Sequence, residues 1–108
     1  MYAYPSIWEE TSCISLLECM AAGLYCMVTN YGALYETGAD FPAYVNYETN
    51  HENIAHQFAE GIKLSQTMLH DPIIQEHLDE QQKYVKRFYS WDKKAIEWTN
   101  FLTGLVND

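Results

Sequence analysis

The first 62 residues of this 108-residue chain contain no lysine or arginine, although they carry eight of its acidic residues. An acidic stretch of this kind repels nucleic acid, so we expect no nucleic-acid partner. It also offers no cationic side chain to a phosphate group. A diphosphate bound to this stretch therefore needs positive charge from another part of the protein.

Several familiar site patterns are missing as well. The chain has neither the G-x-G-x-x-G pattern of dinucleotide-binding folds nor the G-x4-G-K-S/T pattern of P-loops. His51 and His56 are spaced one residue too widely to share a helical face, as two zinc ligands of a protease helix do. His70 and His77 are separated by the helix-breaking pair Asp71-Pro72. We therefore expect no metal site and no cofactor.

Long hydrophobic runs and paired cysteines are absent too. No apolar stretch reaches the roughly 20 residues of a membrane span, and the start of the chain has no basic region typical of a signal peptide. Cys13, Cys19 and Cys26 are odd in number and show no C-x-x-C spacing. We expect a soluble, cytoplasmic protein with no membrane span, in a reducing compartment.

What is present indicates one packed globular domain over residues 1–108. Apolar residues make up 48% of the chain and aromatic residues 15%, which argues against disorder. A domain of this length buries roughly two thirds of the surface of its unfolded chain.

The order of local signals in the first half predicts an α/β fold. A strand ends at Pro5-Ser6, a helix runs from Cys13 to Gly23, and an apolar strand follows at residues 25–30. A helical turn at residues 34–37, stopped by Gly38, and a third strand at residues 43–47 complete the series. This order predicts about three parallel strands flanked by helices, a partial Rossmann-like domain.

The second half has a helical period from His51 onward. Asp71-Pro72 is typical of a helix start, and Ser90 is a suitable cap for a last helix. The residues expected on the apolar faces are Ile54, Phe58, Ile62, Ser65 and Leu69, then Ile74, Leu78, Gln81, Val85 and Phe88, then Trp91, Ala95, Trp98, Leu102 and Leu105. The runs are too short for a coiled coil, so we expect these helices to pack on the sheet and on one another.

Two carboxylates frame the turn between the first strand and the first helix. Glu10 lies in the turn, and Glu18 lies in the helix, where we expect it on the smaller, more polar side. Thr11 and Ser12 are good N-cap residues, and the free N–H groups of a helix start attract phosphate. Ligands of open parallel sheets collect at the carboxyl ends of the strands, where this turn lies. The Asn30-Tyr31-Gly32-Ala33 turn follows the next strand and either lines the same crevice or is an ordinary connection.

This stretch resembles the retaining nucleotide-sugar glycosyltransferases of the GT-B architecture, of the group 1 or family 4 type. The matching residues are Tyr4-Pro5-Ser6, Glu10 and Glu18 with seven residues between them, Met20 to Gly23, the strand at residues 26–30, Gly32 and Glu36. The resemblance implies that Glu10 contacts the donor sugar as the catalytic-site residue and that Glu18 binds the ribose. It assigns the phosphates or the sugar to the backbone of Thr11, Ser12, Cys13 and Ile14. Glycines are usual where Thr11 and Cys13 stand.

The resemblance implies transfer of a sugar, with retention, from a donor such as a UDP- or GDP-sugar to a hydroxyl acceptor. The chain is then a C-terminal fragment of the donor-binding domain, inactive alone. It needs an N-terminal acceptor domain from the same or another chain, and in such enzymes the segment of residues 89–98 crosses back to that domain. The competing hypothesis is a non-catalytic interaction module that docks on another chain or oligomerises. For Cys13, a nucleophilic thiol stands as an alternative to a packing residue.

Overall fold

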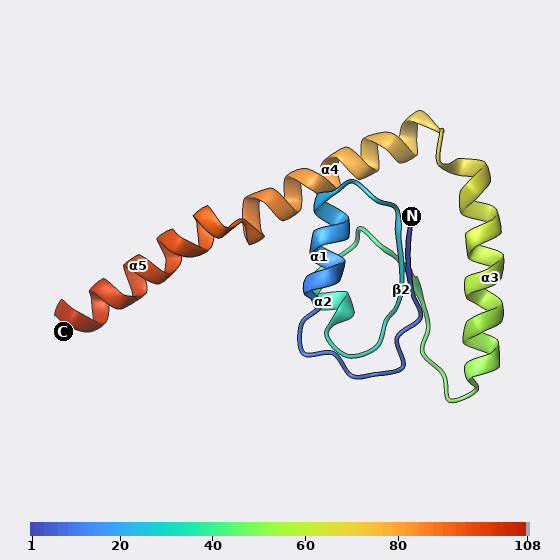
Figure 1. Ribbon diagram of the computed structural model, residues 1–108, viewed down its shortest axis with the longest axis horizontal. Coiled ribbons are helices and arrows are strands. Elements are labelled where there is room, and N and C mark those ends of the chain that lie inside the picture. The colour runs from blue at the N-terminus through green and yellow to red at the C-terminus, as the bar shows by residue number, and fades with distance from the viewer. Residues whose placement is uncertain (108) are drawn as a thin grey trace.

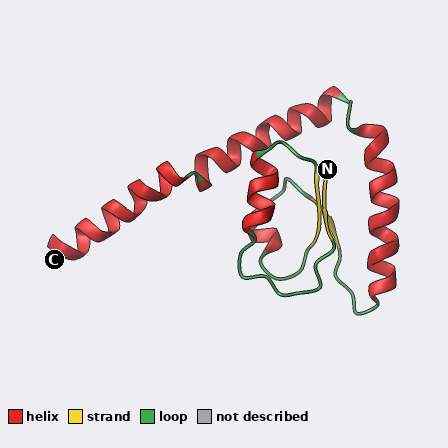
Figure 2. Ribbon diagram, viewed as in Figure 1, coloured by secondary structure: helices red, strands yellow, loops and turns green. Residues whose placement is uncertain are grey.

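A computed structural model of the chain describes residues 1–107 as an α/β domain whose second half is helical (Figures 1 and 2). In chain order, the elements are β1 (Tyr2–Tyr4), α1 (Ile14–Ala21), β2 (Cys26–Thr29), α2 (Leu34–Gly38), β3 (Ala43–Val45), α3 (His51–Met68), α4 (Pro72–Tyr89) and α5 (Trp91–Asn107). The predicted elements are all found, and most of them begin or end within about two residues of their expected limits.

The three strands form one parallel sheet in the order β1-β2-β3. Tyr2 pairs with Cys26, and Met27 pairs with Ala43. The prediction of three parallel strands flanked by helices is confirmed. Because all three strands run in the same direction, the segments that follow Tyr4, Thr29 and Val45 emerge at one edge of the sheet.

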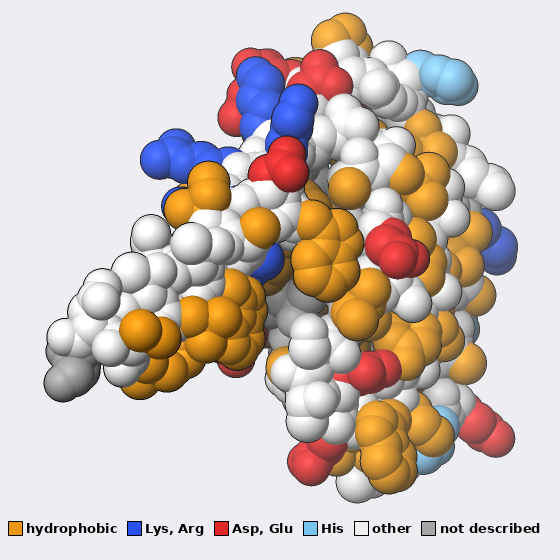
Figure 3. Space-filling model, turned by 60° about the vertical axis from the view of Figure 1, so that its left-hand side comes forward, with side chains coloured by type: hydrophobic (Ala, Val, Ile, Leu, Met, Phe, Trp, Pro, Cys, Tyr) orange, Lys and Arg blue, Asp and Glu red, His pale blue; other side chains and the backbone are white. Residues whose placement is uncertain are grey.

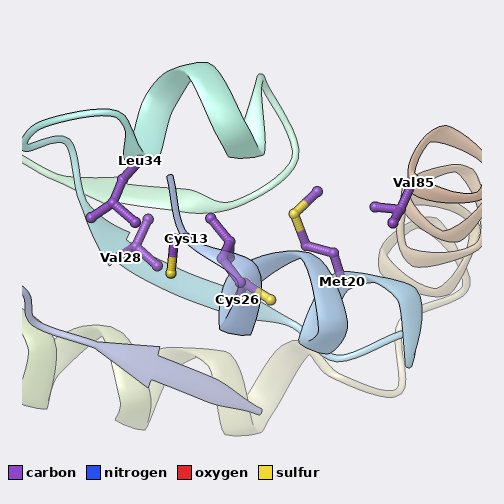
Figure 4. Packing of buried hydrophobic residues seen from close by; sticks show 7 residues of the cluster. Cys13, Met20, Cys26, Val28, Leu34 and Val85 are labelled. Atoms are coloured by element: carbon purple, nitrogen blue, oxygen red, sulfur yellow. The ribbon is translucent and has the colours of Figure 1, made fainter. Parts of the chain in front are cut away.

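The two faces of the sheet are covered by different helices. α1 and α2 lie on one side and α3 on the other (Figure 1). The α1 side holds the larger buried cluster, in which side chains from α1, β2, α2 and α4 point toward one another (Figure 4). Its buried members are Cys13, Leu16, Met20, Cys26, Val28, Leu34 and Val85. On the α3 side, Met27 and Val45 pack against Ile54 and Phe58.

Local signals define most of the helix ends. Gly23 has a φ of +80°, and its N–H donates to the Met20 carbonyl at 3.1 Å, while the Leu24 N–H donates to Cys19 at 3.1 Å. This pair of bonds is a Schellman motif, which ends α1 as predicted. Asp71 caps α4 by accepting a hydrogen bond from the Ile73 N–H at 2.8 Å, with Pro72 in the first turn.

The end of α2 differs from the prediction. Gly38 belongs to α2, and Ala39 takes the left-handed conformation after it, with a φ of 53°. A Cβ on Gly38 would lie 2.7 Å from Pro42 Cγ and from the Tyr44 hydroxyl, so close packing explains the glycine better than a turn does. Ser90 does cap α5, because its Oγ accepts from the Lys93 N–H at 3.2 Å.

α4 is attached to the end of α1 through a buried amide. Gln81 is fully buried, and its Nε2 donates to the Met20 carbonyl at 3.1 Å and to the Leu24 carbonyl at 2.9 Å. Leu78 and Val85 are buried on the same face. The structure confirms these three residues of the face predicted from the seven-residue spacing, but Phe88, expected on the same face, is 46% exposed.

The predicted packing of the last helix is wrong. α5 continues away from the body beyond α4 (Figure 1), and none of its described side chains is buried. Trp98, Leu102 and Leu105 are each more than half exposed. An amphipathic stripe shows that a surface is suited to burial, but it does not identify what covers that surface.

Candidate functional site

The turn after β1 is anchored to the neighbouring strand. Ser6 is buried, and its carbonyl accepts a hydrogen bond of 2.6 Å from the Thr29 hydroxyl at the end of β2. The Ser6 hydroxyl is also 3.2 Å from both the N–H and the carbonyl of Trp8. The turn therefore starts from a fixed point at the carboxyl edge of the sheet.

Glu10 is held by both turns of that edge. Its carboxylate accepts a hydrogen bond from the Tyr4 hydroxyl, which raises the pKa of Tyr4 because the carboxylate favours the protonated phenol. Its carbonyl accepts a hydrogen bond of 2.8 Å from the Ala33 N–H. Gly32 has a φ of +60°, and a Cβ there would lie 2.5 Å from the Glu10 nitrogen. The turn at residues 30–33 therefore packs on the first turn, as the crevice hypothesis requires.

A pair of tyrosines that the sequence did not single out lies beside these turns. The rings of Tyr31 and Tyr47 are stacked, with centroids 3.9 Å apart and planes at 10°. Asn30 fixes this arrangement, since its Oδ1 accepts from the Tyr47 N–H at 2.9 Å. Burial, followed by the nearby Glu9 carboxylate, raises the pKa of Tyr31. Only the contact between two loops reveals this cluster, so residue spacing gave no signal for it.

The N-terminus of α1 opens toward this edge without a side-chain cap. The helix begins at Ile14, and Cys13 is its N-cap residue, with no side chain accepting from the first turn. The prediction that Thr11 or Ser12 caps the helix is therefore wrong. Both residues are exposed, and the first turn of α1 contains no acidic residue. The amides at Ser12 to Ile14 consequently lie at a helix end that carries partial positive charge.

Cys13 itself faces the core. It is 5% exposed and belongs to the buried cluster of α1, β2 and α2. This position favours the packing interpretation over a reactive thiol, because a nucleophile needs access to its target. Cys19 and Cys26 are also free thiols.

Glu18 is exposed on α1 together with Ser15 and Ala22, as expected for the polar side of the helix. Leu16 and Met20 form the buried face of α1. The side chain of Glu18 also lines a groove with Ile14, Leu17 and Ala21, which the sequence did not predict. The carboxylate is exposed at the wall of that groove.

The groove between α1 and the α4–α5 junction has a volume of about 920 Å³. Its apolar walls include Val85, Tyr89 and Trp91, and it is lined by Lys83, Lys86, Lys94, Gln82 and Asp79 as well as by the α1 residues. These lysines come from outside the cation-free stretch of residues 1–62 and line the same groove as Glu18. Residue spacing does not predict this shared groove, because more than 60 residues separate α1 from these lysines.

The structure places five of the six predicted site residues on two neighbouring surfaces and buries the sixth. Glu10, Thr11 and Ser12 belong to the turn, whereas Ile14 and Glu18 line the groove, and Cys13 is in the core. Glu10 does not line that groove, so joint contact of Glu10 and Glu18 with one ligand stays a prediction. Ile14, at the start of α1, is where the two surfaces approach each other.

Comparison of the chain with protein-family models, with curated proteins and with solved structures gives no match. Among residues 1–107, no group of three histidine, cysteine or acidic side chains is arranged to hold a metal ion. Within the same residues, no helix has both the length and the hydrophobicity needed to cross a bilayer.

Proposed function

We propose that this chain is the donor-binding part of a retaining glycosyltransferase and binds a nucleotide-diphosphate sugar. The supporting observation is the backbone contact between the two turns at the carboxyl edge, beside the uncapped end of α1. Ala33 bonds Glu10 at 2.8 Å, and Gly32 leaves no room for a side chain there. This edge of a parallel sheet is where such folds bind nucleotides.

In this proposal, Glu10 accepts hydrogen bonds from sugar hydroxyls and Glu18 accepts them from the ribose. The amides at Thr11, Ser12, Cys13 and Ile14 face the phosphates or the sugar, and the partial positive charge of the helix end stabilises the leaving diphosphate. Lys83, Lys86 and Lys94, which line the groove with Glu18, would supply further positive charge. The Tyr4 hydroxyl is a positioning group, because it fixes the Glu10 carboxylate.

Transfer to a hydroxyl acceptor would require an N-terminal acceptor domain from the same or another chain. We therefore expect the purified 108-residue chain to bind a donor without turning it over. Turnover of any nucleotide sugar by the purified chain would contradict this part of the proposal.

The test is a titration with UDP-glucose and with GDP-mannose, followed by the fluorescence of Trp8, which lies in the turn and is 75% exposed. We expect saturable binding that weakens by about tenfold or more in Glu10→Gln and in Glu18→Gln, since a hydrogen bond to a charged group contributes roughly 1.5–3 kcal/mol. Glu76→Gln, at an exposed position of α4, is the matched control. Absence of saturable binding by the unaltered chain would overturn the proposal.

A second candidate is a non-catalytic interaction module. One observation favours it: α5 carries a row of large apolar side chains, and none of the described ones is buried. A chain of this kind would show concentration-dependent association and no response to nucleotide sugars.

A further inference from the structure

The apolar surface of α5 is the largest feature that the donor-site proposal does not use. Its side chains are gathered along the helix that projects toward the viewer in Figure 3. Those exposed by half or more are Trp91, Ile96, Trp98, Phe101, Leu102, Leu105 and Val106. Single exposed apolar residues are ordinary on a monomer, but a continuous group of this size marks an interaction surface.

The charge pattern restricts the partner. The chain has a net charge of −9, yet residues 98–107 contain no charged side chain. Two copies of this acidic protein repel each other over most of their surface, and the second half of α5 is where they can approach without that cost.

The charges near the two ends of α5 favour one orientation for a pair of these helices. α5 begins beside the groove, where Trp91 and Lys94 line it together with Lys86 from the end of α4. The last turn of α5 has no basic residue, so its C-terminal end carries uncompensated negative partial charge. That end is complementary in charge to Lys86, at the end of α4, and to Lys94, near the start of α5. Two α5 helices can each place their C-terminal end beside these lysines of the other copy only when the helices run antiparallel.

We propose that α5 pairs antiparallel with α5 of a second copy of this chain. Leu102 and Leu105 of each copy pack on the stripe of the other, and the C-terminal end of each helix lies near Lys86 and Lys94 of its partner. The symmetry is twofold, with the same surface used on both sides. The proposed dimer shares Lys86 and Lys94 with the proposed donor groove, but Leu102 does not line that groove, so its substitution tests the dimer separately from donor binding.

The available surface is sufficient for a specific pair. The two aromatic residues Trp98 and Phe101 each present 150–250 Å² when fully accessible, and the structure leaves 60% and 57% of them exposed. Trp91, Leu105 and Val106, which are 89%, 59% and 85% exposed, add to this area. A standard interface buries roughly 800 Å² per partner, so a stable pair needs most of this stripe.

The test is the mass of the purified full chain by light scattering and by sedimentation over a wide concentration range. We expect a monomer–dimer equilibrium whose dissociation constant rises by at least about 30-fold in Leu102→Glu. Ile73→Glu places the same charge at a residue of α4 that is 74% exposed and outside the proposed interface, and it should leave the equilibrium unchanged. Circular dichroism checks that both variants keep their helix content.

A third variant tests the orientation. Lys86→Glu should weaken the dimer several-fold in antiparallel pairing, because the negative end of the partner helix then meets a carboxylate. In a parallel pair that end lies far from Lys86. A monomer at all concentrations, including one that captures a different protein, would overturn the proposal, and so would a dimer unaffected by Leu102→Glu. A dimer insensitive to Lys86→Glu would overturn the antiparallel arrangement.

Discussion

The sheet region, which comprises β1 to β3 and α1 to α3, and helix α5 both have regularly spaced apolar residues. In the structure, those of the sheet region are buried and those of α5 are exposed. Leu16, Val28 and Leu34 of the sheet region are fully buried, whereas Trp98, Leu102 and Leu105 of α5 are all more than half exposed. Strands β1 to β3 and helices α1 to α3 cover one another, whereas the main contact of α5 is with α4. The comparison shows that an apolar stripe predicts a surface suited to burial, but not whether the same domain covers that surface.

The strongest test of this difference is to shorten one leucine side chain in each region. Leu34→Ala should lower the free energy of unfolding by about 2–5 kcal/mol, because it leaves a cavity in a closed core. Leu105→Ala, at a residue that is 59% exposed, should change it by no more than about 0.5 kcal/mol. Urea denaturation at protein concentrations low enough for a monomer measures both. Equal losses would show that α5 packs on the body in solution.

The sequence predicted the elements whose signals are local. Gly23 ends α1, Asp71-Pro72 starts α4 and Ser90 caps α5 because each acts on backbone groups within a few residues. The strands were predictable for a related reason, since short apolar runs between turn residues are typical of a buried parallel sheet.

The candidate site was less predictable, because its contacts join distant segments. Helix α1 is apolar on more than one side, so residue spacing alone does not identify Leu16 and Met20 as its buried face. Glu18 is exposed as expected, but the groove that it lines is formed with a distant segment of the chain. The approach of Gly32 to Glu10 could be anticipated from parallel-strand topology, but the presence of lysines in the same groove as Glu18 depends on how α4 packs on α1.

Two glycines sharpen the comparison at the level of the backbone. Gly32→Ala should destabilise the protein by about 1–3 kcal/mol, since its φ is +60° and the new Cβ would lie 2.5 Å from the Glu10 nitrogen. Gly104→Ala in α5 meets nothing within 4 Å and should stabilise the helix by roughly 0.5–1 kcal/mol. Thermal unfolding of the two variants checks the opposite signs. A neutral Gly32→Ala would mean that the two turns do not touch.

Alkaline pH should destabilise the sheet region and not α5, and we expect this effect to be smaller and more gradual than those of the substitutions. Burial raises the pKa of the Cys26 thiol from 9.0 to about 12, and burial also raises the pKa of Tyr2 and of Tyr44. The folded state holds these protons more tightly than the unfolded chain does, so their contribution to stability is complete below pH 9. It is lost as the pH rises toward 12, by at most about 1.4 kcal/mol per pH unit for each group.

A cysteine variant isolates this contribution. Cys26→Ala should lower the free energy of unfolding by the same amount at every pH below 9, where the thiol is protonated in both states. Between pH 9 and 12, the free energy of unfolding of this variant should fall less steeply than that of the unaltered chain. Helix α5 contains no tyrosine or cysteine, so none of these groups belongs to it. Urea denaturation across this pH range measures the slopes. Identical slopes in the two proteins would show that the Cys26 thiol is not buried in solution, and the core of the sheet region would then be as open as α5.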